Sequence, residues 1–290
     1  MKPSRRYRLV QGLLRDTGLR KRVLKDIPRG KQRNMRPKGK QARRWTRELF
    51  EGRAVWICHP QTGATDSVYV HLHGGAYVYG IQSFHYTSLS ELADYAGMTV
   101  IMPDYPLPPD AHAGEIMAWA DRHFASAVEC YGLDNVALGG CSAGGNLALA
   151  VLQMRYGRGD THPDTVVLWS PWMDLTEADA PPTDADDYEA LISPYALEPA
   201  VGAYIADSGL KRSDPRVSPI HADLSSLPPL HIVTGQRDIL HPEIDAFARR
   251  AEAAGTLRDY VVEPEYGHYW MFYPVPDRHP TLRQIAAWLR

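Results

Sequence analysis

The sequence predicts an α/β protein with a mostly parallel sheet of about eight strands and helices on both faces. Three observations lead to this prediction. The chain has 290 residues, enough for one large α/β domain. After residue 42, short strand-like segments alternate with helical ones, which is typical of a doubly wound sheet. Several strand segments, such as Val166–Trp169, are continuous apolar runs, as expected of strands buried on both faces.

The expected strands and helices follow one another in a regular order. Strands are expected near Trp45–Phe50, Arg53–His59, Val68–His73, Thr99–Asp104, Asn135–Gly139, Thr165–Ser170, Leu230–Thr234 and Arg258–Glu263. Helices are expected near Ser83–Gly97, Ala113–Tyr131, Ala143–Tyr156, Pro242–Gly255 and Thr281–Leu289. The first two strands, joined by the short Glu51–Gly52 turn, should form an antiparallel hairpin.

One segment interrupts the alternation. Residues 173–216 are acidic at first and then helical near Tyr188–Ser208. An insertion at this point lies above the carboxyl ends of the strands, where open α/β sheets bind ligands, so we expect it to act as a lid. We therefore divide the chain into a basic N-terminal cap or tail at residues 1–45 and a domain at 46–290, with the cap insertion at 173–216.

The N-terminal segment has an apolar stripe among basic residues. From Leu9 to Ile27 the apolar side chains recur at roughly helical spacing, and Pro28 ends the pattern. This predicts an amphipathic helix. Its apolar face packs on the domain or, alternatively, lies on an anionic membrane surface.

The net charge of −2 conceals two oppositely charged parts. Residues 1–47 hold 18 Lys or Arg and 2 Asp or Glu, whereas the remainder holds 14 and 32. The acidic body has the wrong sign for binding nucleic acid. The basic segment suits an anionic membrane, an anionic substrate or the acidic lid residues 174–189. The sequence leaves open whether the protein is a monomer or a dimer.

Cysteine usage and hydropathy bear on the compartment. Three cysteines form no disulfide framework, which fits a reducing compartment. No apolar run approaches the length of a membrane span or of a standard signal sequence. We expect a cytoplasmic protein.

The strongest chemical signal is the pentapeptide Gly140-Cys141-Ser142-Ala143-Gly144. It follows a predicted strand and opens a predicted helix. This context is typical of a nucleophile elbow, a sharp turn that lifts the serine hydroxyl above the sheet. We therefore expect Ser142 to be a catalytic nucleophile.

A serine hydroxyl needs a base, and the base needs an acid to orient it. His268 follows the last predicted strand in a glycine-containing loop and is the expected base, with His279 as the alternative. Asp238 stands just past the strand at 230–234 and is the expected acid. Glu243 and Asp245 are alternatives that lie further from the strand end.

Attack on a carbonyl creates an oxyanion, which requires hydrogen-bond donors aimed at it in advance. The sequence His73-Gly74-Gly75-Ala76 follows the strand at 68–73 and offers backbone N–H groups with no side chains in the way. We expect the oxyanion hole to be formed by the amides of Gly74, Gly75 and Ala143.

Together these motifs resemble the hormone-sensitive-lipase-like branch of the α/β-hydrolase fold. The resemblance runs from about Val68 to Trp270 and also includes Asp104–Pro109, similar to DYRLAPE, and Asp214–Pro219, similar to DPxxSP. It implies an α/β-hydrolase fold with a helical cap, and a serine carboxylesterase that acts on short or medium acyl chains. It implies no cofactor and no metal.

The sequence departs from the family pattern at three places. Ala76 stands where HGGG has its last glycine, and Cys141 stands where GDSAGG has Asp. We expect the alanine to change little, whereas the cysteine removes a carboxylate beside the nucleophile. The basic N-terminus is the third departure, since it lies where the family's cap begins.

The substrate is expected to be a small neutral acyl ester. Aromatic residues predicted to line its pocket are Tyr77, Tyr79, Trp172, Tyr195, Tyr269 and Trp270. The same triad would serve an amidase or a lactonase, and a non-catalytic binding protein on this fold is a further alternative. A zinc site at His71 and His73 is a third, but no carboxylate cluster accompanies these histidines.

Overall fold

The computed structural model describes residues 2–16, 34–177 and 194–290, without the side chains of Asp16 and residues 194–196. In this part of the chain, eight strands form one sheet in the order β1-β2-β4-β3-β5-β6-β7-β8. The strands are β1 (Trp45–Phe50), β2 (Arg53–Cys58), β3 (Val68–Leu72), β4 (Thr99–Pro103), β5 (Val136–Cys141), β6 (Val166–Trp169), β7 (Leu230–Gly235) and β8 (Leu257–Glu263). β2 pairs antiparallel with β1 and β4, and all other neighbours pair parallel. The predicted sheet and its N-terminal hairpin are confirmed.

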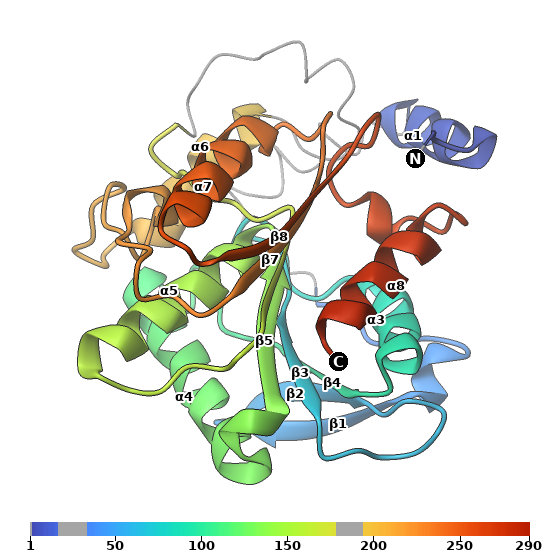
Figure 1. Cartoon of the computed structure of the whole chain (residues 1–290), viewed down its shortest axis with the longest axis horizontal. Helices are drawn as coiled ribbons and strands as arrows, with labels where there is room; N and C mark the ends of the chain where they lie inside the picture. Colours follow the sequence, from blue (N-terminus) through green and yellow to red (C-terminus); the bar gives the residue numbers. More distant parts are fainter. Residues whose placement is uncertain (1, 17–33, 178–193) are drawn as a thin grey trace.

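Helices cover both faces of this sheet (Figure 1). α3 and α8 lie together on one face, and α4, α5 and α7 lie on the other. The described helices are α1 (Arg5–Asp16), α3 (Ser83–Ala96), α4 (Ala113–Tyr131), α5 (Ala143–Arg158), α6 (Pro194–Ile205), α7 (His241–Ala253) and α8 (Arg278–Trp288). The arrangement is the α/β-hydrolase fold that the sequence predicted.

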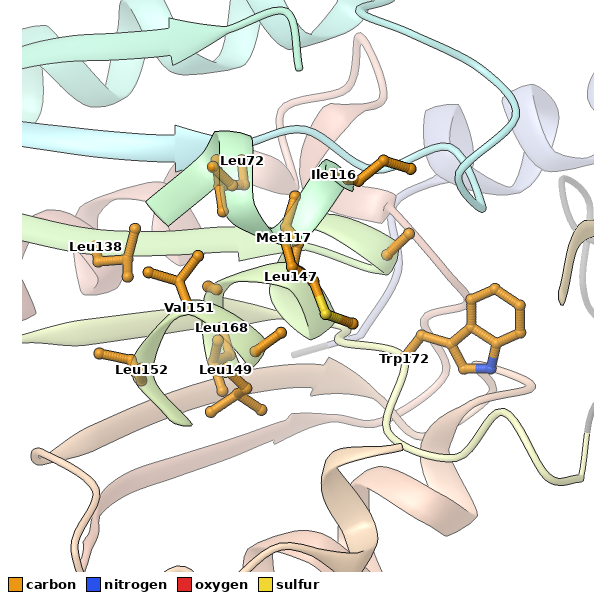
Figure 2. Packing of buried hydrophobic residues seen from close by; sticks show 14 of the residues in the cluster. Leu72, Ile116, Met117, Leu138, Leu147, Leu149, Val151, Leu152, Leu168 and Trp172 are labelled. Carbon is orange, nitrogen blue, oxygen red and sulfur yellow. The ribbon is translucent and has the colours of Figure 1, made fainter. Parts of the chain in front are cut away.

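Two clusters of apolar side chains fill the space between the sheet and its helices, one on each face. Figure 2 shows part of the first, in which Leu138 and Leu168 from the strands pack near Leu147 and Val151 of α5 and Met117 of α4. All five side chains are buried. The second cluster lies between the other face and α3 and α8. Burial on both faces explains why the central strands are continuous apolar runs.

The element boundaries differ from the predicted ones by a few residues. α8 begins at Arg278 and therefore includes Pro280, whereas the prediction started the helix after this proline. Proline fits there because the first turn leaves its N–H groups without partners inside the helix. β5 runs to Cys141, beyond the predicted end at Gly139, because Gly140 and Cys141 still pair with Leu168 and Trp169 of β6.

The N-terminal helix begins four residues earlier than the predicted Leu9 start. α1 begins at Arg5, and residues 17–27 of the predicted Leu9–Ile27 helix lie outside the described part. Tyr7 is buried against the body, whereas Leu9 and Leu13 are 64% and 56% exposed. Among the described helices, none is long and apolar enough to cross a membrane.

The described end of the insertion packs over the strand ends. α6 falls within the helix predicted at Tyr188–Ser208, and the ring of its Tyr204 stacks on Tyr77 with centroids 3.7 Å apart. The acidic residues at 178–189 lie outside the described part, as does any pairing of them with the basic N-terminus.

Candidate active site

Ser142 stands on a sharp turn between β5 and α5. Its backbone adopts φ 51° and ψ −121°, a conformation that costs a non-glycine residue about 1–3 kcal/mol. The turn brings α5 so close to β3 that a Cβ on Gly144 would lie 2.0 Å from the Leu72 carbonyl oxygen. A glycine is therefore required two residues after the serine. The turn at Ser142 therefore has the sharp, strained backbone that was predicted for this pentapeptide.

His268 and Asp238 form a buried pair. The distance from His268 Nδ1 to Asp238 Oδ2 is 2.8 Å, and neither side chain has exposed area. The other carboxylate oxygen, Oδ1, accepts the N–H of Leu240 at 2.9 Å. A carboxylate can only accept, so the proton lies on Nδ1 of the neutral ring and the lone pair on Nε2. This is the tautomer that a general base for a serine requires.

The alternative triad residues have partners elsewhere. Glu243 is buried and accepts the backbone N–H groups of Met173 and Asp174, and burial raises its pKa well above the usual value. Asp245 pairs with Arg249 on the outside of α7, at 2.6 Å. His279 contacts Tyr95 and Glu91 on the α3 side. Of the predicted acids, Asp238 is the one whose carboxylate lies at hydrogen-bond distance from His268 Nδ1.

The glycine-rich loop after β3 has a strained backbone. Gly75 has φ 127°, and a Cβ there would lie 2.2 Å from the Tyr79 carbonyl oxygen. Ala76 and Tyr77 follow with φ 52° and 57°, so two consecutive non-glycine residues adopt the left-handed conformation. The N–H groups of Gly75, Ala76 and Ala143 donate to no acceptor in the described part of the chain. Such amides can serve an oxyanion.

Gly74 differs from the sequence expectation, because its N–H already donates to the sulfur of Cys141 at 3.1 Å. The Cys141 sulfur also lies 3.7 Å from Nε2 of His85. Nδ1 of His85 accepts the N–H of Gln82, so in the neutral ring the proton lies on Nε2, facing the sulfur. Burial raises the pKa of Cys141 to about 12, so the group is a neutral thiol near pH 7. Cys141 thus ties the glycine loop to α3.

The aromatic residues predicted to line the pocket have different surroundings. Tyr77 is buried and donates to Asn146, and Trp172 belongs to the apolar cluster on the α5 face. Tyr79 is partly exposed, whereas Trp270 is fully buried in the other cluster, beside Tyr266. The side chain of Tyr195 lies outside the described part.

Tyr269 is a lining candidate that contacts His268 directly. Its ring stacks on His268 with centroids 4.2 Å apart. Its hydroxyl packs so tightly on Gly74 that a Cβ there would lie 1.5 Å from it. Burial raises the pKa of Tyr269 well above its usual value, so the phenol keeps its proton.

Asn146 was not singled out in the sequence. It is fully buried on α5, where its Oδ1 accepts the Tyr77 hydroxyl at 2.6 Å. Its Nδ2 donates to the carbonyls of Trp172 (2.9 Å) and Val217 (2.8 Å). One side chain therefore connects the glycine loop, the exit of β6 and the Asp214–Pro219 motif. A lone polar residue four positions after the serine, on a buried helix, was the available signal.

Residues of the Asp104–Pro109 and Asp214–Pro219 motifs support the loops that follow β3 and β6. The Tyr105 hydroxyl donates to the His73 carbonyl at 2.6 Å, and its ring stacks on the His73 imidazole at 4.1 Å. Ser218 accepts the N–H of Leu175 at 2.9 Å and so fixes the chain after β6. These contacts hold the backbone of the two loops in place.

His71 and His73, the zinc alternative, have separate partners. His71 Nδ1 lies 3.0 Å from the Tyr69 hydroxyl, and His73 Nδ1 lies 2.9 Å from the Gly74 carbonyl. Burial lowers the pKa of His71 to about 3 and that of His73 to about 4. Within the described ranges, no three His, Cys, Asp or Glu side chains are grouped as metal ligands would be.

Known proteins resemble this chain in sequence and in structure. A family model described as alpha/beta hydrolase fold (Abhydrolase_3) matches residues 69–272. An esterase of Acinetobacter venetianus is 34% identical over 67% of this chain and 64% of the esterase, so the chain spans slightly under two thirds of that relative's length. An acetyl-hydrolase of Streptomyces hygroscopicus is 34% identical over 76% of this chain and 74% of the hydrolase.

A solved structure extends the likeness to nearly the whole chain. It is an esterase from the bacterial hormone-sensitive lipase family, 26% identical, with a TM-score of 0.81 over 100% of this chain and 99% of that one. The family model includes the glycine loop, the elbow, Asp238 and His268. In structure the chain is similar to bacterial hormone-sensitive-lipase-type esterases, and it belongs to the alpha/beta hydrolase fold family.

Proposed function

We propose that the protein is a serine carboxylesterase that hydrolyses short- to medium-chain acyl esters through an acyl-enzyme. The single observation that carries the proposal is the buried His268–Asp238 pair, with its 2.8 Å hydrogen bond, on the same sheet edge as the strained Ser142 elbow. The activities named for its relatives, an esterase and an acetyl-hydrolase, support the reaction class.

In this mechanism Nε2 of His268 removes the Ser142 hydroxyl proton while the serine oxygen attacks the ester carbonyl carbon. Asp238 stabilises the imidazolium that forms. The histidine then protonates the departing alcohol, leaving an acyl group on the serine. A water molecule, deprotonated by the same histidine, releases the acid and restores the enzyme.

For the oxyanion we assign the donors to the amides of Gly75, Ala76 and Ala143. The three N–H groups lack other acceptors among the described residues, whereas the N–H of Gly74 is held by Cys141. Gly74 thus anchors the loop instead of donating to substrate. Each donor in such a hole contributes about 2.7–4 kcal/mol to transition-state stabilisation.

The cap is proposed to consist of residues 1–45 and 173–216. Two described contacts support this division. Tyr204 of α6 stacks on Tyr77 of the glycine loop, and the Asn34 side chain contacts Asp104 and the Ile81 backbone at the end of that loop. Tyr77 and Tyr269 are then the aromatic residues closest to the acyl group.

The test is hydrolysis of p-nitrophenyl esters from acetate to palmitate, comparing the wild type with Ser142→Ala and adding a chelator. We expect turnover that is lost in Ser142→Ala, unaffected by the chelator and optimal at a short or medium chain. Retained turnover in Ser142→Ala would exclude the proposal. Turnover of anilides or lactones but not of esters would assign an amidase or a lactonase, and binding of esters without turnover would assign a binding protein.

A further inference from the structure

Tyr7 anchors the N-terminal helix to the body of the molecule. Among the described side chains of α1, Tyr7 alone is fully buried, at 1% exposure. Its neighbours Arg6 and Arg8 face solvent. Val10 and Leu14 pack against the same apolar cluster but stay partly exposed, so Tyr7 is the side chain of the helix that enters the body most deeply.

That contact reaches the loop that carries His268. The Tyr7 hydroxyl accepts the N–H of Gly267 at 2.9 Å, one residue before the histidine. The Tyr7 ring packs against Tyr266 and Tyr273, with centroids 4.7 and 5.8 Å away. The loop on both sides of His268 therefore rests on one residue of α1.

A second tie fixes the same loop a few residues further on. Asp277 accepts both the N–H and the hydroxyl of Ser4, at 2.7 and 2.6 Å, and its Oδ1 also accepts the Tyr266 hydroxyl at 2.7 Å. Burial acts to raise the pKa of Asp277, but the hydrogen bonds from Ser4 and Tyr266 outweigh it and hold the pKa below its usual value. A charged carboxylate thus clamps the loop to the N-terminus.

The loop that carries His268 has a strained backbone. It leaves β8 at Glu263 and passes through left-handed conformations at Glu265 (φ 69°) and Tyr269 (φ 66°) before α8 begins. Strained loop conformations persist only where surrounding contacts hold them. The His268–Asp238 hydrogen bond tolerates only small displacements, because such bonds weaken steeply with distance and angle.

We propose that Tyr7 is a positioning residue, which holds the loop at Gly267 so that the His268 ring stays against Asp238. The basic N-terminal segment is therefore part of the catalytic framework in addition to any role as a cap. This inference rests on the proposed function of His268 as the base.

The test is Tyr7→Phe, which keeps the ring and removes the acceptor of the Gly267 N–H. The matched control is Tyr86→Phe. The Tyr86 hydroxyl also bonds the N-terminal segment to the body, donating to the Met35 carbonyl at 2.8 Å, and its ring packs against Trp45 and Trp56. We expect Tyr7→Phe to lower kcat about three- to tenfold, the value of one hydrogen bond, with KM within twofold. The acid limb of the pH profile of kcat/KM should shift in Tyr7→Phe and should be unchanged in Tyr86→Phe.

Equal effects of the two variants on kcat and on the acid limb would overturn the proposal, since a merely structural role predicts them. If Tyr7→Phe does not fold, Ser4→Ala removes the hydroxyl that donates to Asp277 and accepts the Tyr7 N–H, and it must lower kcat and shift the acid limb in the same direction, or the proposal fails. Ser142→Ala separates the positioning role of Tyr7 from the esterase mechanism itself. An inactive Ser142→Ala beside a fully active Tyr7→Phe refutes the positioning role and leaves the esterase assignment intact.

Discussion

Replacing Asp238 by Asn tests the proposed base–acid pair, because it exchanges one carboxylate oxygen for an NH₂ group. The two carboxylate oxygens have different partners, because Oδ2 faces His268 Nδ1 at 2.8 Å and Oδ1 accepts the Leu240 N–H at 2.9 Å. In the asparagine, the amide oxygen should stay with the Leu240 N–H, since a buried N–H requires an acceptor. The amide nitrogen then faces Nδ1 with a donor.

This arrangement forces the histidine into the wrong tautomer. Nδ1 must accept from the asparagine, so the proton moves to Nε2 and no lone pair remains for the serine. The same change in a serine protease triad lowers kcat by about 10⁴, which is about 5.5 kcal/mol. We expect a loss of that order here, because neither His268 nor Asp238 has exposed side-chain area through which water could substitute for the lost acceptor.

The assay is steady-state hydrolysis of p-nitrophenyl butyrate, with circular dichroism to check the fold. The matched control is Asp245→Asn on α7, where a partly exposed carboxylate pairs with Arg249 at 2.6 Å. We expect the control to keep kcat within about twofold, since exposed pairs contribute about 0–1 kcal/mol. An Asp238→Asn enzyme that folds and keeps more than a tenth of the wild-type kcat would refute the tautomer argument.

Three other predictions concern stability and surface contacts. Burial lowers the pKa of His123 to about 4, so the folded state resists its protonation below the unfolded pKa of about 6.5. Stability should therefore fall by about 2 kcal/mol between pH 7 and pH 5 from this residue, and urea unfolding of His123→Phe should lack that component. Asn146→Ala should cost on the order of 3 kcal/mol in the same assay, because it leaves the Tyr77 hydroxyl and two buried carbonyls without their partner. Finally, the exposed side chains of Leu9 and Leu13 lie on a helix with several arginines, so we expect the protein to sediment with anionic but not with neutral liposomes. The double variant Leu9→Ser, Leu13→Ser should sediment less, and equal sedimentation of wild type and variant would count against the membrane contact.

The sequence was sufficient for the features that depend on local order. A strand, a GCSAG turn and a buried helix follow one another directly, so Ser142 and its elbow could be predicted from spacing. The pairing of Asp238 with His268 could also be predicted, because both residues follow neighbouring parallel strands, β7 and β8, whose carboxyl ends meet at one edge.

Contacts between distant segments could not be predicted in this way. Gly74 was expected to donate to the substrate, but its N–H meets the Cys141 sulfur, 67 residues later in the chain. The local sequence pattern does not show that β3 and β5 are neighbours in the sheet. The free amide of Ala76 was missed because its left-handed backbone is uncommon for alanine and is imposed by the surrounding loop.

The bond between Ser4 and Asp277 has a consequence for how the chain becomes active. It joins residues 273 positions apart, and the Tyr7–Gly267 contact spans 260. Contacts of such sequence separation form late, because their loop-closure entropy is repaid only when most of the chain is ordered. The nucleophile elbow, built from neighbouring residues, can form early. During refolding from urea, esterase activity should therefore return after the far-ultraviolet dichroism has recovered, and a nascent chain should stay inert until residues near 277 have been synthesised.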